Sequence, residues 1–461
     1  MNLEQSEQKL KPLEAFIITL IVIGGISYSL IFAGAVPHIP IVLAIMGLFL
    51  YGIYKKVSVK ELEEAIIDGA KSGAGAVFIF LFIGMLISSW MESGTIPTFI
   101  YLALEVVSDK WFYAIVFAVT AIIGMSIGSS LTTAATIGVA FMSVSTALGL
   151  SDAITAGAVI SGAFFGDKMS PLSDTTILAS STVHVDLFDH IRNMAWTTVP
   201  AFILSFLLFV ILSPSESAAS FANLDLLKAS LKDNDLVHWY SLLPFVVLAL
   251  LAIKKVPAII TLASGIGTSL IVTLFSQKEI SLQGLMNTLF AGYSSNTGVE
   301  EIDSMLSRGG MESMMFSVSL ILLALAMGGL FFKLGILPAL LAGISGMLNK
   351  VWSLVVWTAG TAITINFLVG EQYLSILLTG SSFKERYKKM GLHGKNLSRI
   401  LEDAGTVVNP LVPWSVCGVF LTGVLGVETL SYLPFTFFCL LSPIITMVFG
   451  MTGFKLSKVE E

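Results

Sequence analysis

The chain contains repeated apolar stretches that are each long enough to cross a lipid bilayer. A helix that spans the hydrocarbon core needs about 20 predominantly apolar residues. Simple or nearly simple stretches of this kind lie at residues 13–34, 37–54, 73–91, 194–212, 237–253, 257–275, 312–333 and 426–450. Four others, at 110–147, 152–183, 350–383 and 396–424, are interrupted by Gly, Pro, Ser and charge. We therefore expect an all-α polytopic membrane protein with about 10–12 transmembrane helices, several of them broken helices or re-entrant hairpins.

The composition excludes most soluble classes of protein. Of 461 residues, 55% are apolar and only 12% are charged, against about 25% charged in ordinary globular domains. A net charge of −6 argues against nucleic acid as a partner. The sequence has no phosphate-binding loop, nucleophile elbow or zinc-protease motif, so we expect neither an enzyme nor a cofactor. Cys417 and Cys439 lie in apolar runs and are expected to be reduced packing residues.

Basic residues gather in segments that can share one side of the membrane. They lie in 384–399, 55–71, 254–255 and 455–458, whereas 213–236 and 277–310 contain more acid than base. Because basic loops stay in the cytoplasm, both termini are predicted to be cytoplasmic. The amphipathic segment from Leu62 to Lys71 is predicted to lie on the inner membrane surface, in contact with lipid.

An internal repeat relates the two parts of the chain. Residues 93–97 and Trp111 are echoed by 334–338 and Trp352 at an offset of 241, and 166–172 is echoed by 405–411 at an offset of 239. The predicted topology gives the two copies opposite orientations, and inverted repeats with matched helix breaks are typical of secondary transporters. We divide the chain into an N-terminal helix pair (1–57), repeat 1 (58–212), a linker loop with a helix pair (213–282) and repeat 2 (283–461).

The motif at 166–176 predicts a cation site at a helix break. Pro171 interrupts the helix, which frees backbone carbonyls beside acidic and hydroxyl side chains. The candidate ligands for Na⁺ or a proton are Asp167, Asp174, Ser170, Ser173 and Thr175, and Lys168 can neutralise one acid when the site is empty. A solvated proline turn is the alternative, but ionisable groups inside a membrane are expensive unless they function.

Three further elements extend this candidate site. Gly128 lies among the hydroxyls of one, and Gly370 and Pro410 mark matching breaks in the second repeat. The added candidates are Ser126, Ser129, Ser130, Thr132, Thr133, Asn366, Glu371, Glu402, Asp403 and Asn409. The hydroxyls could instead only pack helices, Glu371 could pair structurally, and Arg399 could pair with Glu402 and Asp403 on an exposed helix face.

The segment from Ser161 to Thr176 closely resembles the signature of the NhaC family of sodium/proton antiporters. Residues 397–406 look like the second signature of that family, and the likeness covers essentially the whole chain. The resemblance implies the ion transporter superfamily, with scaffold helices and a mobile transport part in each repeat. It also implies export of Na⁺, with Li⁺ as an open second cation, in exchange for H⁺ across a bacterial plasma membrane, and leaves a homodimer open.

Two departures from the family pattern keep alternatives in view. Residues 177–180 replace a frequent Asn-Leu-Ala-Pro stretch, and 126–133 differ from a Gly-Thr-Ser-Trp-Gly-Thr type of hairpin. A relative resembling a malate and lactate antiporter makes transport of a small organic anion with the cations the nearest alternative. An intramembrane aspartyl protease fits less well, because it has no use for an inverted repeat and needs two carboxylates about 3 Å apart. A passive sodium channel is the remaining alternative, and it differs in that an imposed sodium gradient would not drive protons uphill.

Overall fold

The computed structural model describes residues 10–106, 111–214, 228–254, 256–276, 281–297, 303 and 306–459. Within these ranges the chain is predominantly helical, and the extended pairing is limited to an isolated bridge between Leu392 and Lys458. Six of the described helices are long and apolar enough to cross a membrane, or up to eight if each of two bent helix pairs is one span. The predicted all-α, polytopic membrane fold is confirmed.

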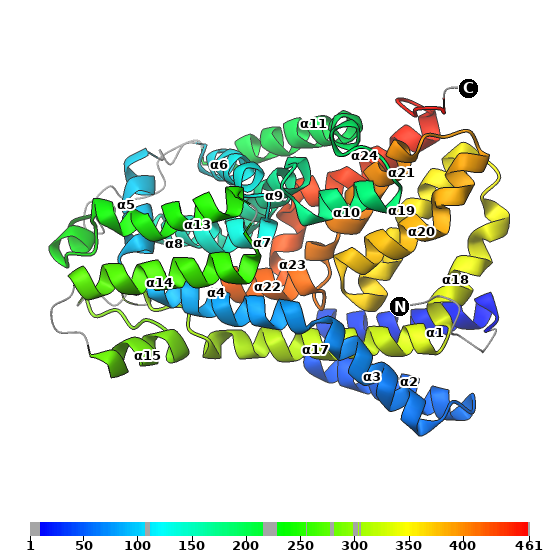
Figure 1. The fold of residues 1–461 in the computed structure, drawn as a ribbon, viewed down its shortest axis with the longest axis horizontal. Helices are drawn as coiled ribbons and strands as arrows, with labels where there is room; N and C mark the ends of the chain where they lie inside the picture. Colours follow the sequence, from blue (N-terminus) through cyan, green and yellow to red (C-terminus); the bar gives the residue numbers. More distant parts are fainter. Residues whose placement is uncertain are drawn as a thin grey trace.

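The first part of the chain forms a helix pair followed by a run of long and broken helices. The elements are α1 (Pro12–Ile31), α2 (His38–Tyr54), α3 (Val59–Ser72), α4 (Ala74–Glu92), α5 (Thr95–Val106), α6 (Phe112–Ile127), α7 (Ser130–Thr133), the π-helix η2 (Ala134–Gly138), α8 (Val139–Ala147), α9 (Asp152–Met169), α10 (Asp174–Thr182) and α11 (Leu187–Leu212). Figure 1 shows α6, α9 and α11 gathered above α4, and α9 packs closely along α6.

The second part repeats this order after a middle group of helices. The middle group is η3 (Trp239–Leu242), α13 (Leu243–Ile253), α14 (Ala258–Ser276) and α15 (Leu282–Ala291). It is followed by η4 (Glu312–Met314), α17 (Met315–Lys333), α18 (Ile336–Ile344), η5 (Ser345–Met347), α19 (Val351–Val369), α20 (Gln372–Lys389), α21 (Gly394–Ile400), the π-helix η6 (Leu401–Thr406), η7 (Asn409–Leu411), α22 (Val416–Leu425), α23 (Thr429–Tyr432), η8 (Leu433–Phe435) and α24 (Phe437–Thr452).

Two equivalent helices of the repeat lie antiparallel to each other. α4 and α17 have the same length, and their bounds differ by 241 residues throughout. A Cβ added to Gly73, before α4, would lie 2.3 Å from Leu325, whereas one added to Gly84 would lie 2.4 Å from the carbonyl oxygen of Gly310. The neighbours on the second copy therefore run backwards as α4 advances, which is the arrangement that an inverted repeat requires.

Residues 112–147 and 351–389 each fold back as a helical hairpin. Gly128 and Gly370 end α6 and α19 with φ of 71° and 74°, a left-handed conformation that favours glycine. The backbone N–H of Ser151, beyond α8, donates to the hydroxyl of Tyr113 near the start of α6, at 3.0 Å. In the second hairpin the Tyr387 hydroxyl donates to Thr358 at 3.3 Å. Both interrupted stretches thus fold back at a glycine, and Val351–Val369 is by itself long and apolar enough to cross a membrane.

The amphipathic helix α3 packs against protein, which corrects the prediction that it lies on the membrane surface. Its buried residues face α17, and a Cβ on Gly69 would lie 2.3 Å from the carbonyl oxygen of Leu325. At its first turn, Lys333 Nζ lies 2.9 Å from Glu61 Oε1. This ion pair, with the hydroxyl and backbone N–H of Ser58, lowers the pKa of Glu61 to about 2. Small residues at the contact allow the close approach that the sequence alone did not show.

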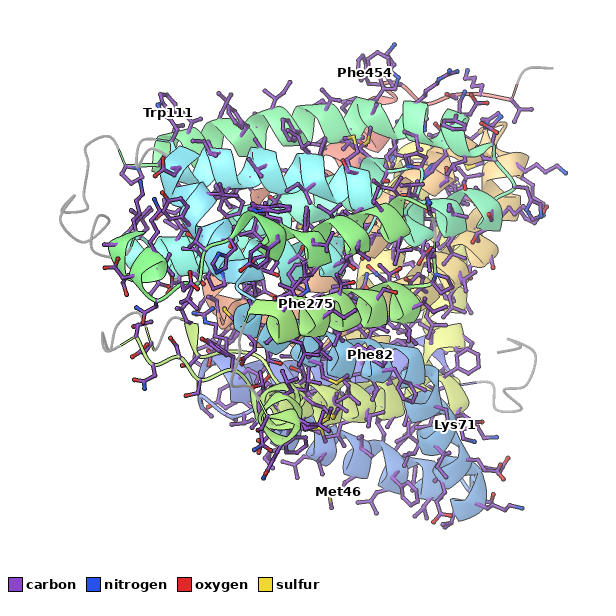
Figure 2. All side chains as sticks on the ribbon, turned by 60° about the vertical axis from the view of Figure 1, so that its left-hand side comes forward. Met46, Lys71, Phe82, Trp111, Phe275 and Phe454 are labelled. Carbon is purple, nitrogen blue, oxygen red and sulfur yellow. The ribbon has the colours of Figure 1, made fainter. Side chains whose placement is uncertain are left out.

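Large apolar side chains cover the outside of the protein. Figure 2 shows Met46, Phe275, Trp111 and Phe454 on the outer surface of the bundle, and Phe275 is 86% exposed. Residues of this kind on a water-facing surface would form unusually large apolar patches. The surface therefore fits a lipid environment, in agreement with the apolar helices.

Candidate functional site

The first helix break lies between α9 and α10. Ser170 has an extended backbone (φ −83°, ψ 129°) directly before Pro171, and its N–H donates to the carbonyl oxygen of Asp167 at 3.0 Å. Ser173 then caps α10 by accepting from the backbone N–H of Thr176. The tip of the first hairpin meets this break, because a Cβ on Gly128 would lie 2.7 Å from Leu172. The breaks predicted at Pro171 and Gly128 thus lie side by side.

Asp167 is buried at this junction. It is 5% exposed, and its Oδ2 accepts a hydrogen bond from the Ser130 hydroxyl at 2.8 Å. The Ser173 hydroxyl lies against the same carboxylate. Ser130 begins α7, so it is the hydroxyl of the 126–133 motif that reaches an acid. Carboxylate and hydroxyl oxygens are suitable ligands for a hard cation such as Na⁺.

Lys168 connects the first break to the second repeat. Its ammonium group forms an ion pair with Asp403 of η6, and neither side chain has any exposed surface. The Ser442 hydroxyl lies 3.3 Å from Lys168 Nζ, and the Thr197 hydroxyl donates to Asp403 Oδ2 at 2.8 Å. The acid that Lys168 neutralises is therefore across the repeat interface, 235 residues away in the chain.

Glu402 is the buried acid without a hydrogen bond. Its side chain is fully buried in the π-helix η6, and neither carboxylate oxygen has a hydrogen-bond partner among the described residues. The Thr406 hydroxyl lies nearby but completes no hydrogen bond with it. The charges of Lys168, Asp167 and Asp403 act on this carboxylate. A π-helix often marks a functional position, and a buried carboxylate without a partner is too costly to persist unless it takes up a cation or a proton.

The buried charges belong to one cluster, which we call the charged cluster. Among the described residues, the buried side chains that carry a formal charge are Asp167, Lys168, Arg399, Glu402 and Asp403. Arg399 is fully buried, and its Nη1 donates to the carbonyl oxygen of Lys455 at 3.2 Å. Its Nε and Nη2 have no hydrogen-bond partner among the residues that the structure describes. It does not lie on an exposed helix face, as one alternative had it. Three carboxylates against two cations leave one net negative charge.

The second break has a complete hydrogen-bond network in place of charges. Asn409 Nδ2 donates to Asn366 Oδ1 at 2.8 Å, and Asn409 Oδ1 accepts from the backbone N–H of Cys417 at 2.9 Å. Asn366 Nδ2 donates in turn to the carbonyl oxygen of Gly405 at 2.7 Å. The segments before and after this break differ in direction by 47°. Asn366 and Asn409 thus hold the tip of the second hairpin against the break that begins at Pro410.

The other candidate residues lie outside the charged cluster. Asp174 is exposed in the first turn of α10, and the half-buried Glu371 caps α20 by accepting from the backbone N–H of Leu374 at 2.7 Å. The remaining hydroxyls, those of Ser126, Ser129, Thr132, Thr133, Ser170 and Thr175, make hydrogen bonds within their own segments.

Three residues at the charged cluster were not predicted as site residues. Thr197 and Ser442 donate to or contact its members, and Arg399 carries one of its charges. The two hydroxyls lie in apolar spans, where serine and threonine also pack helices without any further role. Arg399 was noted in the sequence only as a partner for exposed acids. A signal for all three would have required knowing that α9, α11, η6 and α24 meet.

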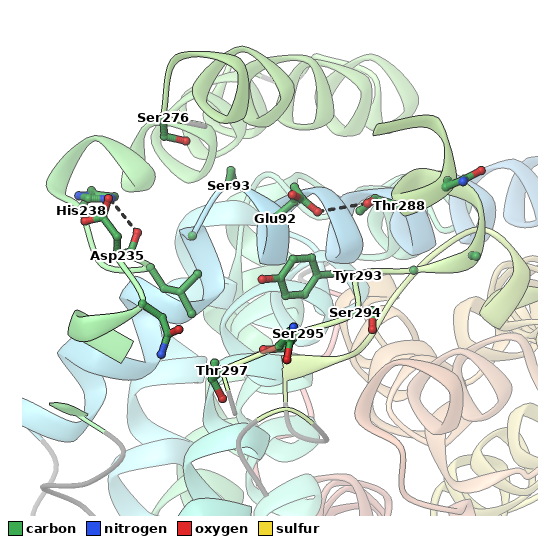
Figure 3. Close-up of a pocket in the computed structure, with 17 residues that line it drawn as sticks. Glu92, Ser93, Asp235, His238, Ser276, Thr288, Tyr293, Ser294, Ser295 and Thr297 are labelled. Carbon is green, nitrogen blue, oxygen red and sulfur yellow. Dashed lines mark hydrogen bonds and ion pairs between the residues drawn. The ribbon is translucent and has the colours of Figure 1, made fainter. Parts of the chain in front are cut away.

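A polar pocket of about 600 Å³ lies elsewhere in the molecule (Figure 3). It is lined by the end of α4, residues 234–238 and residues 287–297, and Glu92 accepts from the Thr288 hydroxyl at 3.1 Å within it. His238 and Asp235 face each other at its edge in Figure 3. None of its lining residues belongs to the hairpins, the breaks or the charged cluster.

Comparison with known proteins shows the family of the chain. The model of the Na⁺/H⁺ antiporter family matches residues 11–186 and 162–454. The chain belongs to the Na⁺/H⁺ antiporter family. It is 42% identical to the Na⁺/H⁺ antiporter NhaC of Alkalihalophilus pseudofirmus, over 92% of both chains. It is also 42% identical to the Na⁺/H⁺ antiporter NhaC of Bacillus subtilis, over 90% of this chain and 92% of the relative. The malate-2H⁺/Na⁺-lactate antiporter of Bacillus subtilis is 33% identical over 94% of both chains.

Proposed function

We propose that this family member is a secondary antiporter that exports Na⁺ in exchange for H⁺ across a bacterial plasma membrane. The observation that carries the proposal is the fully buried, unpartnered carboxylate of Glu402 beside Asp167 at the junction of the two repeats. The two NhaC relatives, both named Na⁺/H⁺ antiporters, support it. Both termini would face the cytoplasm, as the distribution of basic residues predicts.

The coupling follows from the charge of the cluster. With Lys168 held by Asp403, the carboxylates of Asp167 and Glu402 remain to take up a cation. One bound Na⁺ or one bound proton neutralises the single excess negative charge, and a vacant cluster would leave that charge in a medium of low dielectric constant. The protein would therefore switch between exposing the cluster to one side of the membrane and to the other only while the cluster holds Na⁺ or a proton. Exposed Asp174 and half-buried Glu371 would serve the route by which the cation arrives.

Exchange in proteoliposomes tests this proposal. Purified protein is reconstituted with a pH-sensitive dye trapped inside, and Na⁺ is added outside. We expect internal alkalinisation that depends on Na⁺, because sodium entry must be matched by proton exit. Li⁺ is offered separately. No response to either cation between about pH 6 and 9, in liposomes that support a control transporter, would contradict the proposal; that range brackets plausible carboxylate titration in such a site.

Transport of a small organic anion is the second candidate function. It is favoured by the 33% identity to the malate-2H⁺/Na⁺-lactate antiporter. Offering malate and lactate on opposite sides of the same liposomes decides between the two. Uptake of labelled malate that is stimulated by internal lactate would support the second candidate, and Na⁺/H⁺ exchange unaffected by either anion would support the first.

A further inference from the structure

His190 differs from the other histidines in its surroundings. It is fully buried in α11, and within the part of the chain that the structure describes neither ring nitrogen has a hydrogen-bond partner. The other four histidines each have a ring nitrogen within hydrogen-bond distance of a neighbour: His38 with Ser319, His184 with Ser181, His238 with Asp235 and His393 with Lys395. A buried polar group without a partner destabilises the folded protein. A purely structural histidine at this position would be expected to have found a partner.

The position of His190 connects the charged cluster to one face of the protein. Three and seven residues further along α11 lie Asn193, which donates to the carbonyl oxygen of Lys395 at 2.7 Å, and Thr197, which donates to Asp403. This spacing places all three on one side of the helix. Asp189, the residue before His190, has a side chain that is 61% exposed. His190 therefore lies between exposed residues at the start of α11 and the Lys168–Asp403 pair.

The charge that acts on the His190 ring comes from Lys168 of α9. The elements packed against α11 are α6, α9, α10, α21 and α24. Their remaining titratable groups are Tyr113 on α6, Asp152 and Asp167 on α9, Asp174 on α10, Lys395 and Arg399 on α21, and Cys439 on α24, and α11 itself adds Asp189 and Arg192. Of these, Asp167 and Arg399 belong to the charged cluster, and Lys168 is the member of that cluster whose charge acts on the His190 ring.

We propose that His190 relays the transported proton between the charged cluster and the face of the protein that carries residues 384–395. This inference rests on the proposed function. A neutral imidazole has one N–H and one free nitrogen lone pair. The lone pair accepts a proton that arrives through water from the cluster as the other nitrogen releases its own proton to water at the protein face, so the ring never holds a second positive charge beside Lys168. Rotation of the ring restores the first tautomer, so protons and charges balance over each cycle.

His190→Gln separates this role from a structural one. Glutamine keeps a polar side chain of similar reach but cannot carry a proton at neutral pH. Two transport modes are compared in the same liposomes: Na⁺/H⁺ exchange, and exchange of labelled for unlabelled Na⁺, which needs no proton transfer. We expect Na⁺/H⁺ exchange to fall at least about tenfold, since proton transfer by a positioned side chain contributes a factor of about 10²–10⁴. Na⁺/Na⁺ exchange should stay at the wild-type rate.

Controls keep each outcome decisive. His184→Gln makes the same change at an exposed histidine and should alter neither mode. A loss of both modes in His190→Gln and in a second variant, His190→Asn, would show a structural role and overturn the inference. Wild-type rates in both modes would overturn it as well. If the wild-type protein itself shows Na⁺/Na⁺ exchange but no Na⁺/H⁺ exchange, the proposed function fails and not only the role of His190.

Discussion

At the break between α9 and α10, a carboxylate and an ammonium group are buried with few partners, whereas at the break after η6 two amide side chains satisfy one another. Asp167 of the first repeat is matched by Thr406 in the second, and Ser170 is matched by Asn409. The acids of the second repeat, Glu402 and Asp403, come earlier in their helix and reach across to the first break. The two copies thus share the backbone bends but differ in their polar side chains: one break is complete by itself, and we propose that an ion completes the other.

The largest expected effect comes from neutralising the acids of the incomplete break. Asp167→Asn or Glu402→Gln removes a charge that must alternate between Na⁺ and a proton, so Na⁺/H⁺ exchange should fall to the level of empty liposomes. The protein should still elute as a folded species in detergent, because an amide of the same shape relieves a buried charge. Asp189→Asn, at an exposed position, is the matched control. Exchange at the wild-type rate in either buried variant would remove that acid from the site.

A smaller effect is expected on folding when the cross-repeat ion pair is broken. Asp403→Asn leaves the ammonium group of Lys168 buried without a carboxylate, which should lower the free energy of unfolding by about 3–5 kcal/mol. The measurement is thermal unfolding in detergent at pH 7. Replacing both partners, with Lys168→Met and Asp403→Leu, should recover most of that stability but not exchange. An unchanged melting temperature in Asp403→Asn would show that the pair contributes nothing to folding.

At the complete break, we expect stability to change and ion binding to persist. Asn366→Ala removes hydrogen bonds to the carbonyl oxygen of Gly405 and to Asn409, and should cost about 1–3 kcal/mol. The Na⁺ concentration for half-maximal exchange should stay near the wild-type value, because these amides are engaged with protein. A large rise in that concentration, without loss of stability, would instead place Asn366 among the cation ligands and weaken the contrast between the two breaks.

The partly exposed ion pair between Lys333 and Glu61 should have the smallest effect on stability, and that effect should fade at low pH. The pKa of Glu61 is lowered to about 2, so its contribution to stability is complete above the ordinary glutamate pKa of about 4.3 and is lost as pH falls through about 2. Glu61→Gln should therefore reduce the melting temperature slightly at pH 7 and progressively less below about pH 4. Both side chains are partly exposed, so a large shift at pH 7 would contradict their assignment as a weak surface pair.

The sequence predicted the breaks better than it predicted the contacts. Pro171, Gly128, Gly370 and Pro410 act through their own backbone, so their consequences are local and readable from the chain. The partner of Lys168 lies 235 residues away and depends on how α9 meets η6, which no local pattern encodes. The hydroxyl-rich segment 126–133 shows the same limit, because Ser130 alone reaches Asp167 while its neighbours bond locally.

The helix α3 shows why amphipathicity alone was insufficient. A charged stripe opposite an apolar face fits a membrane surface and a protein surface equally well. The contact with protein depends on Gly69 and Gly329, because the absence of their side chains lets α3 approach α17 closely. Similarly, the unpartnered state of Glu402 could not be predicted, because it depends on every neighbour that fails to reach its oxygens.

The dependence of sodium affinity on pH tests most directly whether sodium and protons share Asp167 and Glu402. The Na⁺ concentration for half-maximal exchange is measured at several pH values, with the membrane potential clamped by potassium and valinomycin. Near and below the effective pKa of the shared carboxylates, exchange of one proton for one sodium should raise that concentration nearly tenfold for each unit by which the pH falls. This corresponds to about 1.4 kcal/mol of competition per pH unit. A half-maximal concentration that does not change between about pH 6 and 9, where carboxylates in such sites can titrate, would contradict shared carboxylates and favour separate sites for the two ions.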